Sequence, residues 1–92
     1  MKELKETIEM MCSDDYKERF KAEYHQTKIR YEKLKSFNTK IEAAEMTKFE
    51  KNNIVVEPKH DCPHHLLRDQ QRVMGEYLHI LEVRAVIEGI EL

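Results

Sequence analysis

The chain has 92 residues, 37% of them charged, a net charge of −2 at pH 7, and only two glycines and two prolines. A chain of this length forms one small domain with a marginal core, and its low glycine and proline content favours helices. The lack of a basic excess argues against a general DNA- or RNA-binding protein, so no nucleic-acid polymer is expected as a partner.

Targeting and redox signals point to the cytoplasm. Residues 1–11 are too charged for a secretory signal, and no apolar run approaches the roughly 18 residues of a membrane span. Cys12 and Cys62 lie far apart without a C-x-x-C spacing, which is typical of reduced thiols in a cytosolic protein. The sequence therefore predicts a soluble cytoplasmic protein with no membrane partner.

The first predicted element is a short amphipathic helix over residues 1–12, with Leu4, Ile8 and Met11 on one face. A helix this short is not stable alone, so we expect it to dock on another element. Asp15 and Glu18 then have the spacing of a capping box. They predict the start of a long helix over residues 15–45, which contains no glycine or proline.

One seam runs along this long helix at alternating spacings of four and three. Its members are Phe20, Tyr24, Thr27, Tyr31, Leu34, Asn38 and Ile41. A seam made only for packing would be leucine, isoleucine and valine, whereas this one is half tyrosine and polar groups. The mixed content indicates a compromise between helix packing and contact with a flat anionic ligand.

Residues 46–62 are predicted to form a loop, because Asn52-Asn53 is a turn signal and Pro58 follows. The β-branched triplet Ile54–Val56 within it is expected to pack back on the helices. Too few strands are available for a stable sheet.

A second long helix is predicted over residues 63–88. Asp61 or Cys62 is the expected N-cap, Pro63 suits the first helical position, and Gly89 lies just past the end. Two long helices joined by a loop form an antiparallel hairpin. The predicted fold class is therefore all-α, a short helix plus a helical hairpin, as a single domain over residues 1–92.

The second helix has more apolar surface than one partner helix can cover. One seam comprises Leu67, Met74, Leu78, Leu81 and Ala85, and a second comprises Leu66, Val73, Tyr77, Ile80 and Ile87. The excess predicts a homo-oligomer, either a symmetric dimer or a higher closed ring. Alternatively, the N-terminal helix and the 54–56 triplet fold over this surface. Gly75, in mid-helix, predicts a close approach by another helix or by a ligand.

Few residue patterns indicate catalysis. His60, Cys62, His64 and His65 crowd one junction, but ligands so close in sequence do not easily close a tetrahedral metal site. No P-loop or G-x-G-x-x-G motif is present, and no oxyanion site accompanies Cys62. We therefore expect no metal, no cofactor and no enzymatic activity.

Tyrosines and fixed positive charges gather on the first long helix. Tyrosine stacks on nucleobases, and arginine and lysine pair with phosphate. The predicted ligand-binding residues are Tyr16, Arg19, Tyr24, Lys28, Tyr31, Gln71 and Arg84. The two from the second helix interrupt its apolar seams, and Arg84 is expected to come from a neighbouring subunit. The competing interpretation is a plain helix interface whose tyrosine hydroxyls reach water at the rim.

Two blocks of the chain resemble a family of small phage and prophage proteins named after a crAss-like gut phage protein. The first block is residues 15–24 with 27–34, beginning Asp15-Tyr16-Lys17-Glu18-Arg19-Phe20. The second includes Cys62-Pro63, Leu66-Leu67, Gln71, Met74-Gly75, Tyr77-Leu78, Leu81-Glu82, Arg84-Ala85 and Ile87-Glu88.

The layout of a short element, a tyrosine-led helix, a loop and a second helix is also similar to the hairpin sponges of phages. These act against the CBASS and Thoeris immune systems and hold cyclic nucleotides or cyclic ADP-ribose relatives without cleaving them. Tyr16 matches the start of their long helix, and Tyr31 stands where a sponge has a lysine. The resemblance implies a phage-encoded sponge in the host cytoplasm that sequesters a nucleotide-derived second messenger. Two alternatives stay open, an inhibitor that binds a host immune effector and a structural coiled-coil adaptor.

Overall fold

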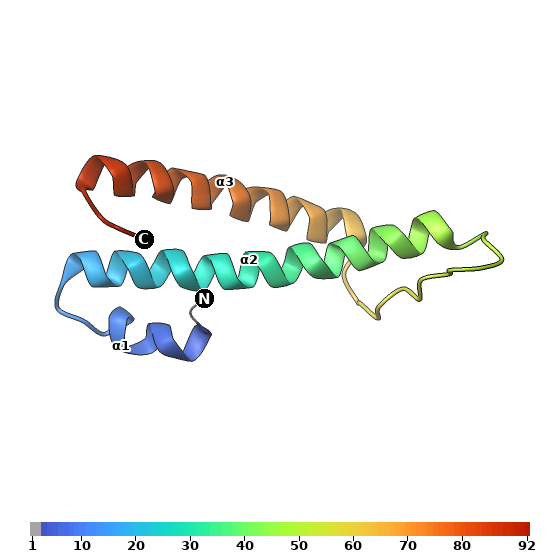
Figure 1. The fold of residues 1–92 in the computed structure, drawn as a ribbon, viewed down its shortest axis with the longest axis horizontal. Helices are drawn as coiled ribbons and strands as arrows, with labels where there is room; N and C mark the ends of the chain where they lie inside the picture. The colour runs from blue at the N-terminus through green and yellow to red at the C-terminus, as the bar shows by residue number, and fades with distance from the viewer. Residues whose placement is uncertain (1–2) are drawn as a thin grey trace.

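The computed structural model describes residues 3–92, and these residues contain helices and no strands, so the predicted all-α class is confirmed. A short 3-10 turn, η1 (Leu4–Glu6), leads into α1 (Thr7–Met11), followed by α2 (Tyr16–Thr47) and α3 (His64–Glu88). Residues 1–2, where the predicted first helix begins, lie outside the described part. Helices α2 and α3 run antiparallel along a shape of 55 × 25 × 22 Å, and α1 lies against the first half of α2 (Figure 1).

Helix α2 begins with a side-chain cap. The Asp15 carboxylate accepts a hydrogen bond from the Lys17 backbone N–H at 3.0 Å, which confirms Asp15 as the N-cap. The reciprocal half of a capping box is not formed with Glu18. Instead, the Asp15 N–H donates to the Ser13 hydroxyl at 3.0 Å. The Ser13 hydroxyl is therefore the acceptor for the N-cap N–H, a role that the sequence assigned to the Glu18 carboxylate. The Asp15 carboxylate lies at the positive end of the helix dipole.

The ends of α3 are set by a proline and a glycine. Pro63 is the N-cap rather than the first helical residue, because its extended ψ of 141° lets its carbonyl accept from the Leu66 and Leu67 N–H groups. At the other end Gly89 adopts φ 69°, as predicted for a C-terminal glycine. The Ile90 N–H then donates to the Ala85 carbonyl at 2.8 Å, which turns Ile90 into the core.

The predicted mixed seam of α2 forms much of the contact with α3. Five of its members are buried, and they are Phe20, Tyr24, Thr27, Asn38 and Ile41. Phe20 and Tyr24 share one apolar cluster with residues of the first α3 seam and the C-terminal tail, namely Leu78, Leu81, Ala85 and Ile90. The polar character of the seam therefore lies within the helix contact itself.

Helix α1 docks on α2, but not through the predicted apolar face. Ile8 and Met11 are exposed, whereas Thr7 is fully buried and donates its hydroxyl to the Leu4 carbonyl at 2.7 Å. Ala22 is also fully buried, although it lies on the side of α2 away from the α3-facing seam. Small side chains at this contact allow the two helices to approach closely.

Two apolar surfaces stay exposed. The second α3 seam is uncovered, so neither α1 nor the loop folds over it. The 54–56 triplet does not pack back as expected either, because Ile54 and Val56 point to solvent. The loop is tied to α2 by a hydrogen bond instead, from the Val55 N–H to the Thr47 hydroxyl at 3.0 Å.

Candidate ligand-binding groove

A groove runs between α2 and α3 along one side of the hairpin. It consists of a cavity of about 420 Å³ and a smaller one of about 280 Å³, and both are lined by Tyr31 and Gly75. The larger is completed by Lys35, Asn38, Thr39, Glu42, His64, Arg68, Gln71 and Arg72. The smaller is completed by Tyr24, Lys28, Glu32, Leu78 and Glu82. Both cavities together are called the α2–α3 groove below.

Gly75 explains why the groove narrows at its middle. A Cβ atom at this position would lie 3.2 Å from Cε1 and 3.4 Å from the hydroxyl of Tyr31, closer than side chains normally pack. The missing side chain therefore makes room for the Tyr31 ring against the backbone of α3. The predicted close approach at Gly75 is confirmed, and the approaching group is an aromatic ring of α2.

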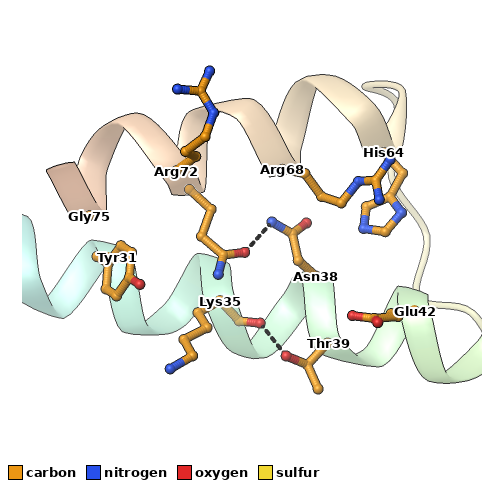
Figure 2. A pocket seen from close by; sticks show the side chains of 10 residues that line it. Tyr31, Lys35, Asn38, Thr39, Glu42, His64, Arg68, Arg72 and Gly75 are labelled. Atoms are coloured by element: carbon orange, nitrogen blue, oxygen red, sulfur yellow. Dashed lines mark hydrogen bonds between the residues drawn. The ribbon is translucent and has the colours of Figure 1, made fainter.

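Positive charge gathers in the larger cavity from both helices. Lys35 comes from α2, while Arg68 and Arg72 lie one turn apart on α3 (Figure 2). Arg72 pairs with Glu76 at 3.2 Å. Lys35 and Arg68 have no carboxylate partner among residues 3–92. These two cations are therefore available to an anion that enters the cavity.

Asn38 fixes the polar floor of the larger cavity. Its side chain is 4% exposed, and its amide nitrogen donates to the Leu67 carbonyl at 3.1 Å and to Gln71 Oε1 at 2.9 Å. The Leu67 carbonyl can only accept, so the group of Asn38 that faces it must be the amide nitrogen. Because that nitrogen also donates to Gln71, the Gln71 atom that it meets must be the amide oxygen. The Asn38 oxygen is left without a partner, on the side of Arg68 and His64 (Figure 2).

His64 contributes a second unpaired polar atom. Its Nδ1 lies 3.4 Å from a Glu45 carboxylate oxygen, while its buried Nε2 has no partner among the described residues. A buried polar atom without a hydrogen bond costs about 1–3 kcal/mol. The cavity therefore holds an orphaned acceptor, Asn38 Oδ1, and an orphaned imidazole nitrogen beneath its cations, a pattern that favours occupation by a polar ligand.

The smaller cavity combines a tyrosine with opposite charges. The Tyr24 hydroxyl donates to Glu82 at 2.7 Å, and Lys28 Nζ lies 5.7 Å from the centre of the Tyr24 ring. Burial, together with the adjacent Glu82 carboxylate, raises the pKa of Tyr24 to about 12. This hydroxyl is therefore a neutral donor held by a carboxylate, and it is already occupied within the chain.

Comparison with models of protein families assigns the chain to a family. The family model named Sequestin matches residues 14–87, which include α2, all of α3 except its last residue, and every residue that lines the groove. The chain belongs to the Sequestin family. No curated protein and no solved structure matches it. The family name is consistent with a protein that sequesters another molecule.

The structure distributes the predicted ligand-binding residues of this Sequestin chain over three places. Tyr24, Lys28, Tyr31 and Gln71 line the groove. Tyr16 and Arg84 meet at the other end of the hairpin, where Arg84 donates to the Tyr16 hydroxyl at 2.6 Å and to Glu88 at 3.2 Å. The Tyr16 hydroxyl in turn donates to Glu88 at 2.9 Å, and this hydrogen bond raises the pKa of Tyr16.

Arg19 lies apart from both groups. Its guanidinium donates to the Ser13 carbonyl at 2.8 Å and lines a different cavity, of about 430 Å³, with Met11 and Tyr77. This cavity lies next to α1, away from the groove. Arg19 is therefore engaged in holding the segment between α1 and α2.

Sequence reasoning missed most of the polar lining of the groove, including its cations and its floor, Lys35, Arg68, Arg72 and Asn38. Lys35 lies one turn after Tyr31, and Arg68 and Arg72 are spaced by four, so each repeats along a helix face. That spacing is also typical of an ordinary solvated helix face. Only the register of the two helices shows that these residues line a groove. Asn38 gave the clearest available signal, since a polar residue within a packing seam requires a partner.

The junction of histidines and Cys62 forms no metal centre in the described part of the chain, where no group of three His, Cys, Asp or Glu side chains is placed to hold an ion. His60 Nδ1 lies 2.6 Å from the Cys62 carbonyl oxygen, and its ring meets Phe37 edge-on with centroids 6.2 Å apart. These contacts give His60 a structural role at the end of the loop. Within residues 3–92, no helix is long and apolar enough to cross a membrane.

Proposed function

We propose that this chain binds a nucleotide-derived signalling molecule in the α2–α3 groove and sequesters it without cleaving it. The observation that carries the proposal is the pair of unpartnered cations, Lys35 from α2 and Arg68 from α3, which line the same cavity as Tyr31. The family name supports sequestration as the kind of activity.

The chemistry of the larger cavity matches the parts of a nucleotide. Lys35 and Arg68 suit phosphate oxygens, arginine as a two-pronged donor and lysine as a point charge. The Tyr31 ring offers an apolar face to a base. Asn38 Oδ1 is an acceptor and the Gln71 amide nitrogen a donor, which together complement the edge of a base or a ribose hydroxyl.

Binding without cleavage fits the groups that line the groove. Cleavage of a phosphodiester or glycosidic bond requires a positioned base or nucleophile. Thr39, the hydroxyl side chain of the larger cavity, donates its proton to the Lys35 carbonyl at 2.8 Å. His64, by contrast, is oriented by Glu45 through Nδ1, an arrangement that a base also uses. We therefore infer from the family name and from the resemblance to sponges that the ligand is held and released intact.

The biological setting that we propose follows the resemblance to phage sponges. The protein would act in the cytoplasm of an infected host and remove a cyclic oligonucleotide or a cyclic ADP-ribose type messenger of CBASS or Thoeris immunity. Self-association is part of the proposal, because the uncovered α3 seam is an apolar surface that a second copy would cover.

Calorimetric titration with cyclic di-AMP, a cyclic trinucleotide and cyclic ADP-ribose tests this function. We expect at least one of these compounds to bind, and chromatography of the bound compound after denaturation to recover it unchanged. Lys35→Gln and Arg68→Gln should each weaken binding about 10- to 100-fold, since a hydrogen bond to a charged group contributes about 1.5–3 kcal/mol.

Two control variants locate the site. Lys40→Gln removes a charge from α2 that does not line the groove, and it should bind like the unaltered protein. Arg19→Gln removes a predicted ligand contact outside the groove. Equal losses in Arg19→Gln and Arg68→Gln would contradict the groove as the site. Failure of a folded protein to bind any of the three compounds would contradict the function.

The apolar loop favours a second candidate function, docking on a protein. Phe49 is 90% exposed and Val56 86% exposed, at the end of the hairpin beyond α3. Exposed apolar side chains of this size can form part of a protein interaction site. Phe49→Ser with Val56→Ser should abolish inhibition of a host effector while leaving nucleotide binding unchanged. Inhibition of the host effector that persists in this double variant would favour the sponge.

A further inference from the structure

The His64 end of the larger cavity is rich in hydrogen-bond acceptors. Asn38 and His64 lie there beside Arg68, and the Glu42 carboxylate lines the same end (Figure 2). Neither Asn38 Oδ1 nor His64 Nε2 has a hydrogen-bond partner within residues 3–92. Glu42 forms no ion pair with a described residue. The two buried atoms, Asn38 Oδ1 and His64 Nε2, are called the acceptor pair below.

The orientation of the Asn38 amide is fixed by its neighbours. Its nitrogen uses one hydrogen toward the Leu67 carbonyl at 3.1 Å and the other toward Gln71 Oε1 at 2.9 Å. A rotation of the amide by half a turn would set its oxygen against the Leu67 carbonyl oxygen, and two acceptors repel. The side chain is 4% exposed, so bulk water does not replace the missing donor. The oxygen therefore stays an unused acceptor of the cavity.

His64 presents an acceptor at the same end. Its Nδ1 lies 3.4 Å from a Glu45 carboxylate oxygen. An ionised carboxylate only accepts, so this contact assigns the ring proton to Nδ1, and the neutral ring then has a bare lone pair at Nε2. Nε2 is buried, and no described residue donates to it. The two buried atoms therefore require the same thing, a donor that enters through the cavity.

An acceptor pair selects hydrogen-bond donors and disfavours phosphate. Phosphate oxygens are acceptors themselves, so the lone pairs of the acceptor pair and the charge of Glu42 repel them. A sugar hydroxyl or the amino group of a base can donate to these atoms instead. The cations Lys35 and Arg68 remain for phosphate. One nucleotide carries both kinds of group, so it can satisfy the cations and the acceptor pair together.

We infer that Asn38 and His64 determine the specificity of the groove by accepting hydrogen bonds from a neutral donor of the ligand, a sugar hydroxyl or a base amino group. The inference rests on the proposed function, because it names the part of the nucleotide that lies at the His64 end. The cations hold the charge that all nucleotides share, whereas the acceptor pair distinguishes one nucleotide from another. A ligand without the donor leaves buried acceptors unpaired, which increases the discrimination against it.

Binding of matched analogues tests the inference. The probes are the three compounds named above, each compared with two analogues. A 2′-deoxy analogue lacks a sugar hydroxyl, and a hypoxanthine analogue has an oxygen in place of the amino nitrogen. For a probe that binds, one of its two analogues should bind about 10-fold or more weakly in calorimetry. The analogue that loses affinity identifies the donor as the hydroxyl or as the amino group.

His64→Leu links this discrimination to the acceptor pair. The variant removes Nε2 and leaves Lys35 and Arg68 in place, so the affinity ratio between the probe and the weaker analogue should fall to about threefold or less. His65→Leu is the matched control, because His65 is exposed and does not line the groove. That variant should keep the full ratio. Circular dichroism checks that both variants are folded.

Nitrogen NMR tests the His64 tautomer without a ligand. In protein labelled with ¹⁵N-histidine, protonated and unprotonated ring nitrogens have different shifts, and the signals missing from His64→Leu belong to His64. We expect the proton on Nδ1 and a shift of Nε2 when a probe binds.

Three outcomes would overturn the inference and leave the proposed function standing. They are a proton on Nε2 of the free protein, equal affinity for a probe and both its analogues, and an equal loss of affinity for all of them in His64→Leu. Absence of binding by every probe would contradict the proposed function and the inference together.

Discussion

The two sides of the α2–α3 hairpin are built from the same helices and differ in what they leave unsatisfied. The groove side leaves polar groups without partners, namely Lys35, Arg68 and the Asn38 oxygen. The opposite side leaves apolar surface without cover at Leu66, Val73, Ile80 and Ile87, which together are called the α3 stripe. Unpaired polar groups favour a polar ligand, and uncovered apolar groups favour another protein surface.

The shared core separates these two sides. Leu78, Leu81 and Ala85 face α2 between the groove and the α3 stripe, and they fix the register of both. A small protein can thus assign recognition to one side and assembly to the other, provided that the core between them is rigid. The comparison predicts that a change in the core alters both sides, whereas a change on one side alters that side alone.

The largest effect is expected from Leu81→Ala. Leu81 is 1% exposed in the centre of the core cluster, and truncation of a buried leucine costs about 2–5 kcal/mol of folding free energy. Because the core sets the helix register, ligand binding and the proposed self-association should both weaken. Chemical denaturation followed by circular dichroism measures the loss.

Ile80→Ala is the neighbouring control for this change. Ile80 lies on the α3 stripe, so its truncation should reduce the free energy of unfolding only at protein concentrations where the proposed oligomer is populated. An equal loss in Leu81→Ala and Ile80→Ala at low concentration would contradict the separation of core and stripe.

A smaller, pH-dependent effect is expected at Tyr24, on the groove side. Its pKa is about 12 in the folded chain and about 10 when unfolded, so the folded state holds this proton more tightly. The stabilisation is fully present below pH 10 and is lost as the pH rises toward 12. Tyr24→Phe should lower stability by about 1 kcal/mol at pH 7, through the lost bond to Glu82.

The difference in unfolding free energy between the unaltered protein and Tyr24→Phe should stay constant below pH 10 and shrink above it. Denaturant titrations at a series of pH values give this difference. Ultraviolet absorbance of tyrosinate, compared between the two proteins, reports the titration of the hydroxyl directly. A hydroxyl that titrates near pH 10 in the folded protein would contradict its tight hold by burial and Glu82.

Local features of the sequence predicted the start of α2 and the end of α3, but not the start of α3, where Pro63 is the N-cap in place of Asp61 or Cys62. Asp15 caps α2 and Gly89 ends α3 because both positions depend only on the conformation of neighbouring residues. The face by which α1 docks was not predictable in this way. Thr7 is buried and Ile8 exposed because the close contact with α2 admits only small side chains.

The candidate site was only partly predictable, since it depends on which residues of α2 and α3 face each other. Tyr31 and Gln71 were expected and do line the groove. Tyr16 and Arg84 were expected to bind a ligand, but they meet each other and Glu88 at the far end of the hairpin. Lys35 and Arg68 resemble solvated surface charges until the register of the two helices brings them to one cavity.

The smallest effect on stability, and the sharpest on recognition, is expected from Gly75→Ala. Alanine gains up to about 1 kcal/mol over glycine within a helix. The added Cβ would meet Tyr31 Cε1 at 3.2 Å, so the ring must move by a few tenths of an ångström, which offsets part of the gain. Tyr31 is only partly buried and its ring has room to move into the groove. The free energy of unfolding should therefore change by less than about 1 kcal/mol.

Ligand binding should respond in the opposite way. Gly75 is where the two cavities of the groove meet, so a displaced Tyr31 ring narrows the passage between them and leaves its stacking position. Calorimetry should show weaker binding of the compound that the unaltered protein binds, while sedimentation shows the same mass as for the unaltered protein, because the α3 stripe is untouched. Tyr31→Ala in the Gly75→Ala background removes the clash but also the stacking ring, so it should relieve strain without restoring affinity. Unchanged affinity in Gly75→Ala would mean that the ligand does not contact Tyr31, and the site would then lie in the larger cavity toward His64 alone.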